Sequence, residues 1–123
     1  MYPVAEEIKL LVESRYPLVY LLTHEEDRAS RLVAKALDSL GLKVGVWSIT
    51  GGGKSAEAPR DPAGLFKSMQ NAGAGATLLL DFHSFLEQPF VLRRLRDLFP
   101  VLRRNGHTLI ILSPVLVIPD EIE

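Results

Sequence analysis

Continuous apolar runs alternate with amphipathic stretches along the chain, which is typical of a parallel sheet whose strands are buried on both faces between helices. Four apolar runs predict strands, and they span residues 17–23, 43–50, 76–82 and 107–113. Strands of this kind, each joined to the next by a helix, form an α/β fold. The sequence therefore predicts a three-layer sandwich around a mostly parallel four-stranded sheet.

Helical periodicity fills the intervals between the predicted strands. In the first interval, apolar side chains recur at spacings of three and four and Gly41 stands where a C-cap belongs, so a helix is predicted over residues 25–40. Pro62 begins a second, short helix. The third covers residues 88–106, and Pro100 is expected to kink or interrupt it. The first residues of the chain predict a further short amphipathic helix.

Composition and charge narrow the kinds of partner that the chain can have. The 123 residues carry 14 basic and 15 acidic side chains, and this balance argues against a dedicated nucleic-acid or membrane-surface binder. The absence of cysteine excludes disulfides, thiolate metal sites and thiol catalysis. No apolar run approaches the length of a membrane span. We expect a cytoplasmic domain with no metal site, no membrane partner and no nucleic-acid partner.

A glycine-rich stretch at residues 51–55 reads Gly-Gly-Gly-Lys-Ser, which is the ending of a phosphate-binding P-loop. A P-loop also needs a glycine five positions before Gly53, where this chain has Ser48. The stretch follows the second predicted strand instead of the first, and the prolines after it prevent a helix from starting at Lys54. The favoured interpretation is a surface loop, and the alternative is a nucleotide site that uses Gly53, Lys54 and Ser55.

The segment after the first predicted strand, where a P-loop belongs, is acidic. Thr23 and Glu26 have the spacing of a capping box, which predicts that Thr23 is the N-cap of the following helix. Glu25, Glu26 and Asp27 fall in its first turn and favour the helix through its dipole. The same carboxylates repel an anion, and neither lysine nor glycine offsets them. A nucleotide phosphate is therefore not expected at this site.

Several blocks of the sequence carry a family resemblance, and together they cover nearly the whole chain. The blocks RYPLVYLLTHEEDRASRLV, VWSITGG, LLLDFHSFLEQPFVLRRLRDL and TLIILSPVLVIPDEIE resemble the N-terminal region of a group of bacterial and plastid-type AAA-family ATPases. In that family a degenerate RecA-like or AAA-like domain precedes a genuine AAA module. The resemblance implies a RecA/AAA-like sheet with strand 1 beside strand 4, and it assigns ATP and magnesium to the module that follows.

The end of the third predicted strand offers two candidate side chains. Asp81 stands where a P-loop ATPase has its Walker B carboxylate, but the next position, where a catalytic glutamate commonly stands, is Phe82. We favour a structural role for Asp81, capping the turn that follows, over a cofactor-binding one. His83 has no nucleophile or phosphate site near it in the sequence, which favours a non-catalytic histidine.

A receiver domain of two-component signalling is an alternative from another functional class. Asp81 would be the phosphoacceptor, Glu25 and Glu26 the acidic pair, and Ser113 the switch hydroxyl. The match is incomplete because the acidic residues lie in a predicted helix and the fifth strand with its lysine is absent. This alternative predicts strand 1 beside strands 2 and 3.

A run of arginines in the last predicted helix is a further candidate interaction surface, formed by Arg93, Arg94, Arg96, Arg103 and Arg104. Arginines opposite a leucine face are typical of the solvated side of an amphipathic helix. Subunit contact is preferred over nucleic acid as a further role, since AAA-type proteins act as rings and an apolar edge with Tyr2, Leu10 and Leu11 needs cover.

The prediction for the whole chain is a single degenerate RecA/AAA-like N-terminal domain over residues 1–123, and the VIPDEIE ending predicts that it is part of a longer protein. We expect a regulatory or assembly domain without catalytic residues and without a cofactor of its own. Its expected partners are its own AAA module and neighbouring subunits, and the longer protein is expected to be the ATPase.

Overall fold

The structure is a computed structural model that describes residues 4–48 and 62–114. One sheet lies at its centre, with strands in the order β1-β4-β3-β2 and every neighbouring pair parallel. The strands are β1 (Leu18–Leu22), β2 (Lys43–Ser48), β3 (Gly75–Leu80) and β4 (His107–Ser113). The predicted α/β sandwich with strand 1 beside strand 4 is therefore confirmed.

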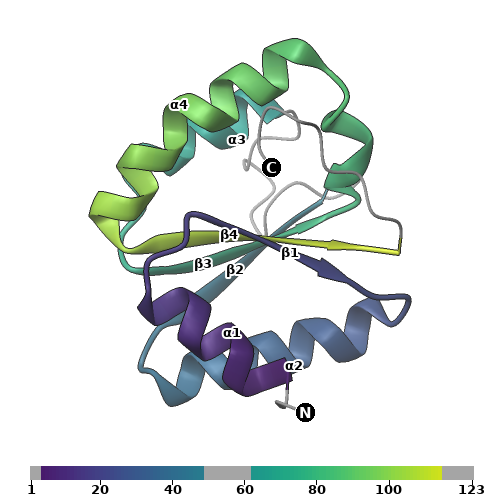
Figure 1. Cartoon of the computed structure of the whole chain (residues 1–123), viewed down its shortest axis with the longest axis vertical. Coiled ribbons are helices and arrows are strands. Elements are labelled where there is room, and N and C mark those ends of the chain that lie inside the picture. The colour runs from purple at the N-terminus through teal and green to yellow at the C-terminus, as the bar shows by residue number, and fades with distance from the viewer. Residues whose placement is uncertain (1–3, 49–61, 115–123) are drawn as a thin grey trace.

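Helices cover both faces of the sheet (Figure 1). On one face lie α1 (Val4–Glu13) and α2 (Glu26–Ser39). On the other lie α3 (Pro62–Met69) and α4 (Pro89–Asn105), with the short 3-10 helix η1 (Phe82–Phe85) directly after β3. None of the helices within the described residues combines the length and the apolar character needed to cross a membrane.

The sheet separates two hydrophobic cores, and β4 contributes to both. Leu109 and Ile111 belong to the core under α3 and α4, whereas Ile110 and Leu112 belong to the core under α1 and α2. All seven residues of β4 are buried. Alternation of side chains along one strand thus supplies both cores, which explains why this segment is continuously apolar in sequence.

The predicted interruption of the last helix at Pro100 is wrong, because α4 runs through Pro100 to Asn105. A proline inside a helix removes the hydrogen bond to the carbonyl four residues before it, here that of Arg96. Both Pro100 and Arg96 are exposed, so the carbonyl without a helical partner is on the side of α4 that water reaches. Gly106 ends the helix in a left-handed conformation, with φ of 72°.

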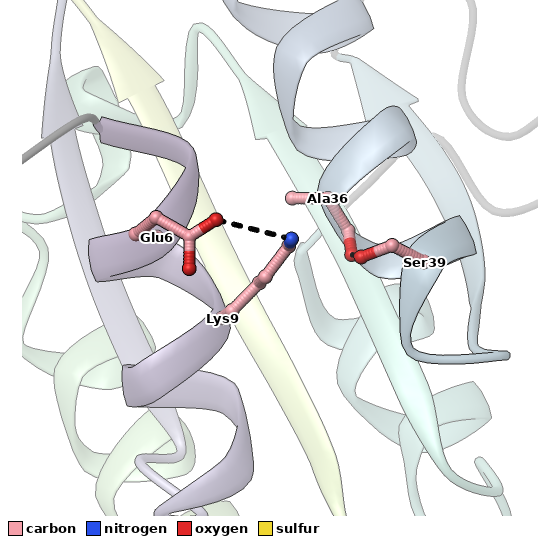
Figure 2. Close-up of polar contacts among 4 residues, drawn as sticks. All are labelled: Glu6, Lys9, Ala36 and Ser39. Atoms are coloured by element: carbon pink, nitrogen blue, oxygen red, sulfur yellow. Dashed lines mark hydrogen bonds and ion pairs between the residues drawn. The ribbon is translucent and has the colours of Figure 1, made fainter.

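Two basic side chains in and just after α1, Lys9 and Arg15, form polar contacts. The Lys9 ammonium of α1 pairs with Glu6 at 3.3 Å and extends toward the last turn of α2, where the Ser39 hydroxyl donates to the Ala36 carbonyl at 2.6 Å (Figure 2). Beyond α1, the Arg15 guanidinium donates to the carbonyls of Arg103 and Arg104 at 3.2 and 3.3 Å. A cation thus satisfies carbonyl groups at the C-terminus of α4, where the helix dipole favours positive charge.

Candidate functional site

Ligands of open α/β sheets bind outside the carboxyl ends of the strands. In this chain that edge carries Thr23 and Glu25 after β1, Asp81 after β3 and Ser113 at the end of β4. The Thr23 N–H donates to the Ser113 carbonyl at 2.8 Å, which extends the pairing of β1 and β4 by one step. The connection from β1 to α2 is therefore held against the centre of the sheet.

The start of α2 differs in detail from the predicted capping box. The helix begins at Glu26 with Glu25 at the N-cap, and Glu25 makes no side-chain cap hydrogen bond. The Thr23 hydroxyl instead accepts the Glu25 N–H at 3.1 Å. Thr23 thus stabilises a turn just before the helix, since a hydroxyl can bond the N–H two residues ahead as well as one three residues ahead. The prediction of Thr23 as N-cap was wrong by two residues.

Four carboxylates gather at this edge, and we call Glu25, Glu26, Asp27 and Asp81 the acidic edge. Partial burial raises the pKa of Glu26 above its ordinary value of 4.5, and the negative charges of Asp81 and then Asp27 raise this pKa further. The fold therefore brings Asp81 close enough to the start of α2 for the two carboxylates to repel each other. An anion placed here meets the same repulsion.

The hollows beside the acidic edge are not phosphate cradles. One, of about 260 Å³, lies between β1 and α2 and is walled mainly by Leu21, Leu22, Ala29 and Leu32. Its basic side chain, Arg28, is already paired with Glu25 at 3.2 Å. The other lies in front of the helix and is lined by His24, Glu25, Glu26, Asp27, Arg28 and Arg31. Three carboxylates against two arginines leave it net negative.

Asp81 lies where the sequence predicts it, directly after β3, and it is exposed with φ of 60°. Aspartate tolerates this left-handed conformation better than most residues, which makes Asp81 suited to the turn into η1. The next residue, Phe82, is 0% exposed and packs in the core under α3 and α4. The position where a P-loop ATPase commonly has its catalytic glutamate is thus part of the hydrophobic core.

The structure describes only some of the remaining predicted residues. Gly53, Lys54 and Ser55 lie outside the described residues, as does the rest of the stretch from 49 to 61. The backbone of His83 lies in η1. Among the residues that the structure describes, no group of three or more histidine, aspartate or glutamate side chains is arranged to hold a metal ion.

The sheet order distinguishes the ATPase-like fold from the receiver alternative. A receiver was predicted to place strand 1 beside strands 2 and 3, whereas β1 pairs with β4 alone within the described sheet. The proximity of Asp81 and Glu26 agrees with an acidic pair, but β4 stands between the strands that carry them. The receiver interpretation of Asp81 and Ser113 is therefore wrong.

A second polar cluster, missed in the sequence, lies at the opposite edge of the sheet. His107, at the start of β4, is 9% exposed and bonds the Gly73 carbonyl through Nδ1 and the Thr77 hydroxyl through Nε2, both at 2.8 Å. Because a carbonyl only accepts, Nδ1 carries the proton, and the neutral ring then accepts from Thr77. Burial lowers the pKa of His107, and the Gly73 carbonyl opposes that shift. The cluster joins two strands and their preceding turn at the amino ends, away from the acidic edge.

We predict that His107 makes the fold sensitive to mild acid. Since its pKa is lower in the folded chain, the unfolded chain takes up a proton first as the pH falls below 6.5. The free energy of unfolding should fall below that pH by up to about 1.4 kcal/mol per pH unit. Urea unfolding at about pH 7.5 and about pH 5.5 measures this decrease in the free energy of unfolding. The decrease should shrink in His107→Asn and persist in His24→Gln, whose histidine is exposed; equal decreases in all three proteins would contradict the assignment.

A second prediction concerns the acidic edge. Asp81→Asn removes one of the charges that raise the pKa of Glu26, so this pKa should move down toward 4.5. A raised carboxyl pKa means that the folded state loses relative stability as the pH rises through the window above 4.5. The variant should therefore gain more stability at about pH 7 than at about pH 3. Carboxyl NMR titration gives the pKa, with Asp97→Asn on α4 as the control; a Glu26 pKa that Asp81→Asn leaves unchanged would rule out the contact.

Known proteins resemble this chain over nearly its whole length. The SpoVK-like AAA ATPase N-terminal domain family matches residues 4–123. The uncharacterized AAA domain-containing protein ycf46 of Guillardia theta is 31% identical over 93% of this chain and 24% of its own length. The ycf46 protein of Pyropia yezoensis is 29% identical over 93% of this chain and 25% of its own length.

A third such protein, from Trieres chinensis, is 27% identical over 96% of this chain and 26% of its own length. The chain thus spans about a quarter of the length of these relatives. No solved structure matches it. Because the family match covers nearly every residue, the chain belongs to the SpoVK-like AAA ATPase N-terminal domain family.

Proposed function

We propose that this domain is a non-catalytic regulatory or assembly unit of an AAA ATPase, and that ATP and magnesium are handled by a separate AAA module of the longer protein. The observation that carries the proposal is the acidic edge, which occupies the position where this type of fold receives a phosphate. The domain keeps the sheet of a nucleotide-binding fold and presents carboxylates at its binding edge.

The size of the repulsion supports this choice. One phosphate charge about 4 Å from one carboxylate loses about 1 kcal/mol in water and about 4 kcal/mol at an effective dielectric constant of 20. Three of the four carboxylates are consecutive at the start of α2, with Glu25 at the N-cap and Glu26 and Asp27 in the first turn. The attraction of a helix N-terminus for an anion, about 0.3–1 kcal/mol at an exposed site, is too small to offset them.

The residues directly after β3 are also poorly suited to hydrolysis. Asp81 stands at the position of a magnesium-facing carboxylate, and the side chain after it is the buried ring of Phe82. A water poised for attack on a phosphate needs a base or a positioning group beside it. The domain therefore acts through contact: it docks on its own AAA module or on neighbouring subunits and transmits a signal, while hydrolysis occurs elsewhere.

Nucleotide binding by the Gly51–Ser55 stretch is a second candidate function, because Gly-Gly-Gly-Lys-Ser supplies backbone N–H groups and a lysine that suit a phosphate. It follows β2, and in this sheet β2 is the strand farthest from β1. A site that used this stretch would follow β2 in the chain, whereas a P-loop follows the first strand. Calorimetric titration with Mg-ATP, in parallel with Lys54→Ala, separates the two functions.

Release of inorganic phosphate from Mg-ATP tests the absence of catalysis. The purified 123-residue chain is expected to release phosphate no faster than a buffer blank, and Asp81→Asn should behave in the same way. Turnover by the chain that disappears in Asp81→Asn would mean that the carboxylate after β3 is catalytic, and the proposed function would be wrong. Turnover that is retained in that variant and survives a second purification would also contradict the proposed function, whereas turnover that a second purification removes would come from a contaminating ATPase.

A further inference from the structure

The two outer faces of the sandwich carry opposite charges. On α4, five arginines and one aspartate leave a formal charge of +4. On α1, three glutamates and one lysine leave a formal charge of -2. The two helices lie on opposite sides of the sheet (Figure 1), so these charges point away from each other within one molecule.

Each of the two helices also exposes one large apolar side chain among its charges. Leu10 of α1 is 64% exposed, and Glu6, Glu7 and Glu13 lie around it at helical spacing; we call these four residues the glutamate face. A hollow of about 440 Å³ is lined by the glutamate face and Lys9. A single apolar group ringed by charges is typical of a contact surface that must also remain soluble.

The matching surface on α4 begins at Phe90, which is 62% exposed. The Arg94 guanidinium lies 5.7 Å from the centre of its ring, in a cation–π contact. We call the arginine face the exposed residues Phe90, Arg93, Arg94, Arg96, Arg103 and Arg104. Aromatic and arginine side chains are the types most enriched in the energetically important parts of protein interfaces.

Few of these charges are neutralised within the molecule. Glu6 pairs with Lys9, and Arg93 lies 3.6 Å from Asp97 in an exposed pair. Glu7 and Glu13 on one face, and Arg94 and Arg96 on the other, form no ion pair within residues 4–48 and 62–114. The charge of each face is therefore available to a partner of opposite sign.

We propose that the arginine face of one copy docks on the glutamate face of a second copy. The proposal rests on the assembly role proposed above and names the surfaces that would perform it. Because the two faces are on opposite sides of the sheet, the contact is head-to-tail, and each added copy leaves one free face of each sign. A contact of this kind closes into a ring or continues as a filament.

A charge swap tests the interface. Arg93→Glu/Arg94→Glu/Arg96→Glu changes the formal charge of α4 from +4 to -2 and makes both faces acidic, and Glu7→Arg/Glu13→Arg changes that of α1 from -2 to +2 and makes both faces basic. Sedimentation velocity of the 123-residue chain should show wild-type association that weakens between about 0.1 M and about 1 M salt, as the screening length falls from about 10 to about 3 Å. Each variant alone should associate at least about tenfold more weakly. A mixture of the two variants, and a chain that carries all five substitutions, should regain association.

The matched control is Arg31→Glu/Lys35→Glu, which reverses two exposed charges on α2 outside both faces and should leave the wild-type association unchanged. The five-substitution chain also guards against misfolding, because a damaged chain could not regain association. A wild-type chain that stays monomeric up to about 1 mM, or variants whose mixture fails to associate, would overturn the proposal.

Binding of a short RNA that is lost in Arg93→Glu/Arg94→Glu/Arg96→Glu, while self-association is unchanged, would assign the arginine face to nucleic acid and would also overturn the proposal. Phosphate release or nucleotide binding by the chain would overturn the proposed function alone. Those assays do not depend on the charge swap, so failure of the interface and failure of the function are distinguishable.

Discussion

Replacing Phe82 with alanine is expected to lower the free energy of unfolding by about 3–5 kcal/mol. The ring is 0% exposed and lies at the centre of an aromatic cluster. Its centroid is 5.8 Å from that of Trp47, 5.9 Å from that of Phe66 and 5.4 Å from that of Phe85. Removal forfeits the buried area of the ring and leaves a cavity among neighbours held by the sheet and by α3. The free energy of unfolding of a small domain is about 5–15 kcal/mol in total, so this loss is a large part of it.

Urea unfolding of the wild-type and variant chains measures this loss, and Phe90→Ala is the matched control. Phe90 is 62% exposed, so its replacement should cost at most about 1 kcal/mol, mainly through the contact with Arg94. Similar losses for the two variants would contradict the placement of Phe82 in the core. The result also bears on function, because a core aromatic at this position cannot be exchanged for a catalytic glutamate without burying a charge.

Gly75→Ala is expected to have the second large effect, a loss of at least about 2 kcal/mol. Gly75 begins β3 with φ of 143°, a conformation that side chains rarely adopt, and a Cβ there would lie 2.6 Å from the Lys43 carbonyl oxygen. Backbone strain and overpacking each cost about 1–3 kcal/mol. The opposing group is the backbone of β2, which cannot move without disturbing the pairing of Lys43 with Gly75.

Gly73→Ala provides the comparison two residues earlier, because a Cβ at Gly73 meets nothing within 4 Å. Thermal or urea unfolding of both variants is sufficient, and Gly73→Ala should stay within about 1 kcal/mol of the wild type. If Gly75→Ala unfolds with wild-type stability, the close approach of Gly75 in β3 to the Lys43 carbonyl in β2 is contradicted.

The strands could be predicted from sequence because burial on both faces leaves a continuous apolar run, of which β4 is the clearest case. Their order could not be worked out from periodicity, since periodicity indicates which runs form strands but not which strands are neighbours. The resemblance to AAA-type domains supplied the order, through blocks such as the one from Arg15 to Val33.

Sequence rules for helix ends gave wrong predictions in two situations. In one, two N–H groups compete for the same hydroxyl; in the other, water lowers the free-energy cost of a lost backbone hydrogen bond. The Thr23 hydroxyl could accept from the N–H two or three residues ahead, and the capping-box spacing alone predicted the wrong one. Pro100 was expected to break its helix, but its exposed position lowers the cost of the lost hydrogen bond. His107 was missed because one polar residue at the start of an apolar strand gives no sign of the Thr77 hydroxyl that it meets.

Only part of the acidic edge could be predicted from the sequence. The run from Glu25 to Asp27 is contiguous and could be predicted to oppose a phosphate. The approach of Asp81 depends on the crossover from β3 back to β4, which lies between β1 and β3, and so it required the sheet order. The opposite charges of α1 and α4 were likewise present in the sequence, but their position on opposite faces follows from the topology (Figure 1).

The most direct measurement of whether this domain binds a nucleotide phosphate is a calorimetric titration of the 123-residue chain with Mg-ATP and with Mg-ADP, in parallel with Lys54→Ala. We expect no heat of binding from either nucleotide with either protein. Binding tighter than about 100 μM that disappears in Lys54→Ala would show that the Gly51–Ser55 loop holds a phosphate. Binding of that strength that survives in Lys54→Ala would contradict the central claim at the acidic edge itself.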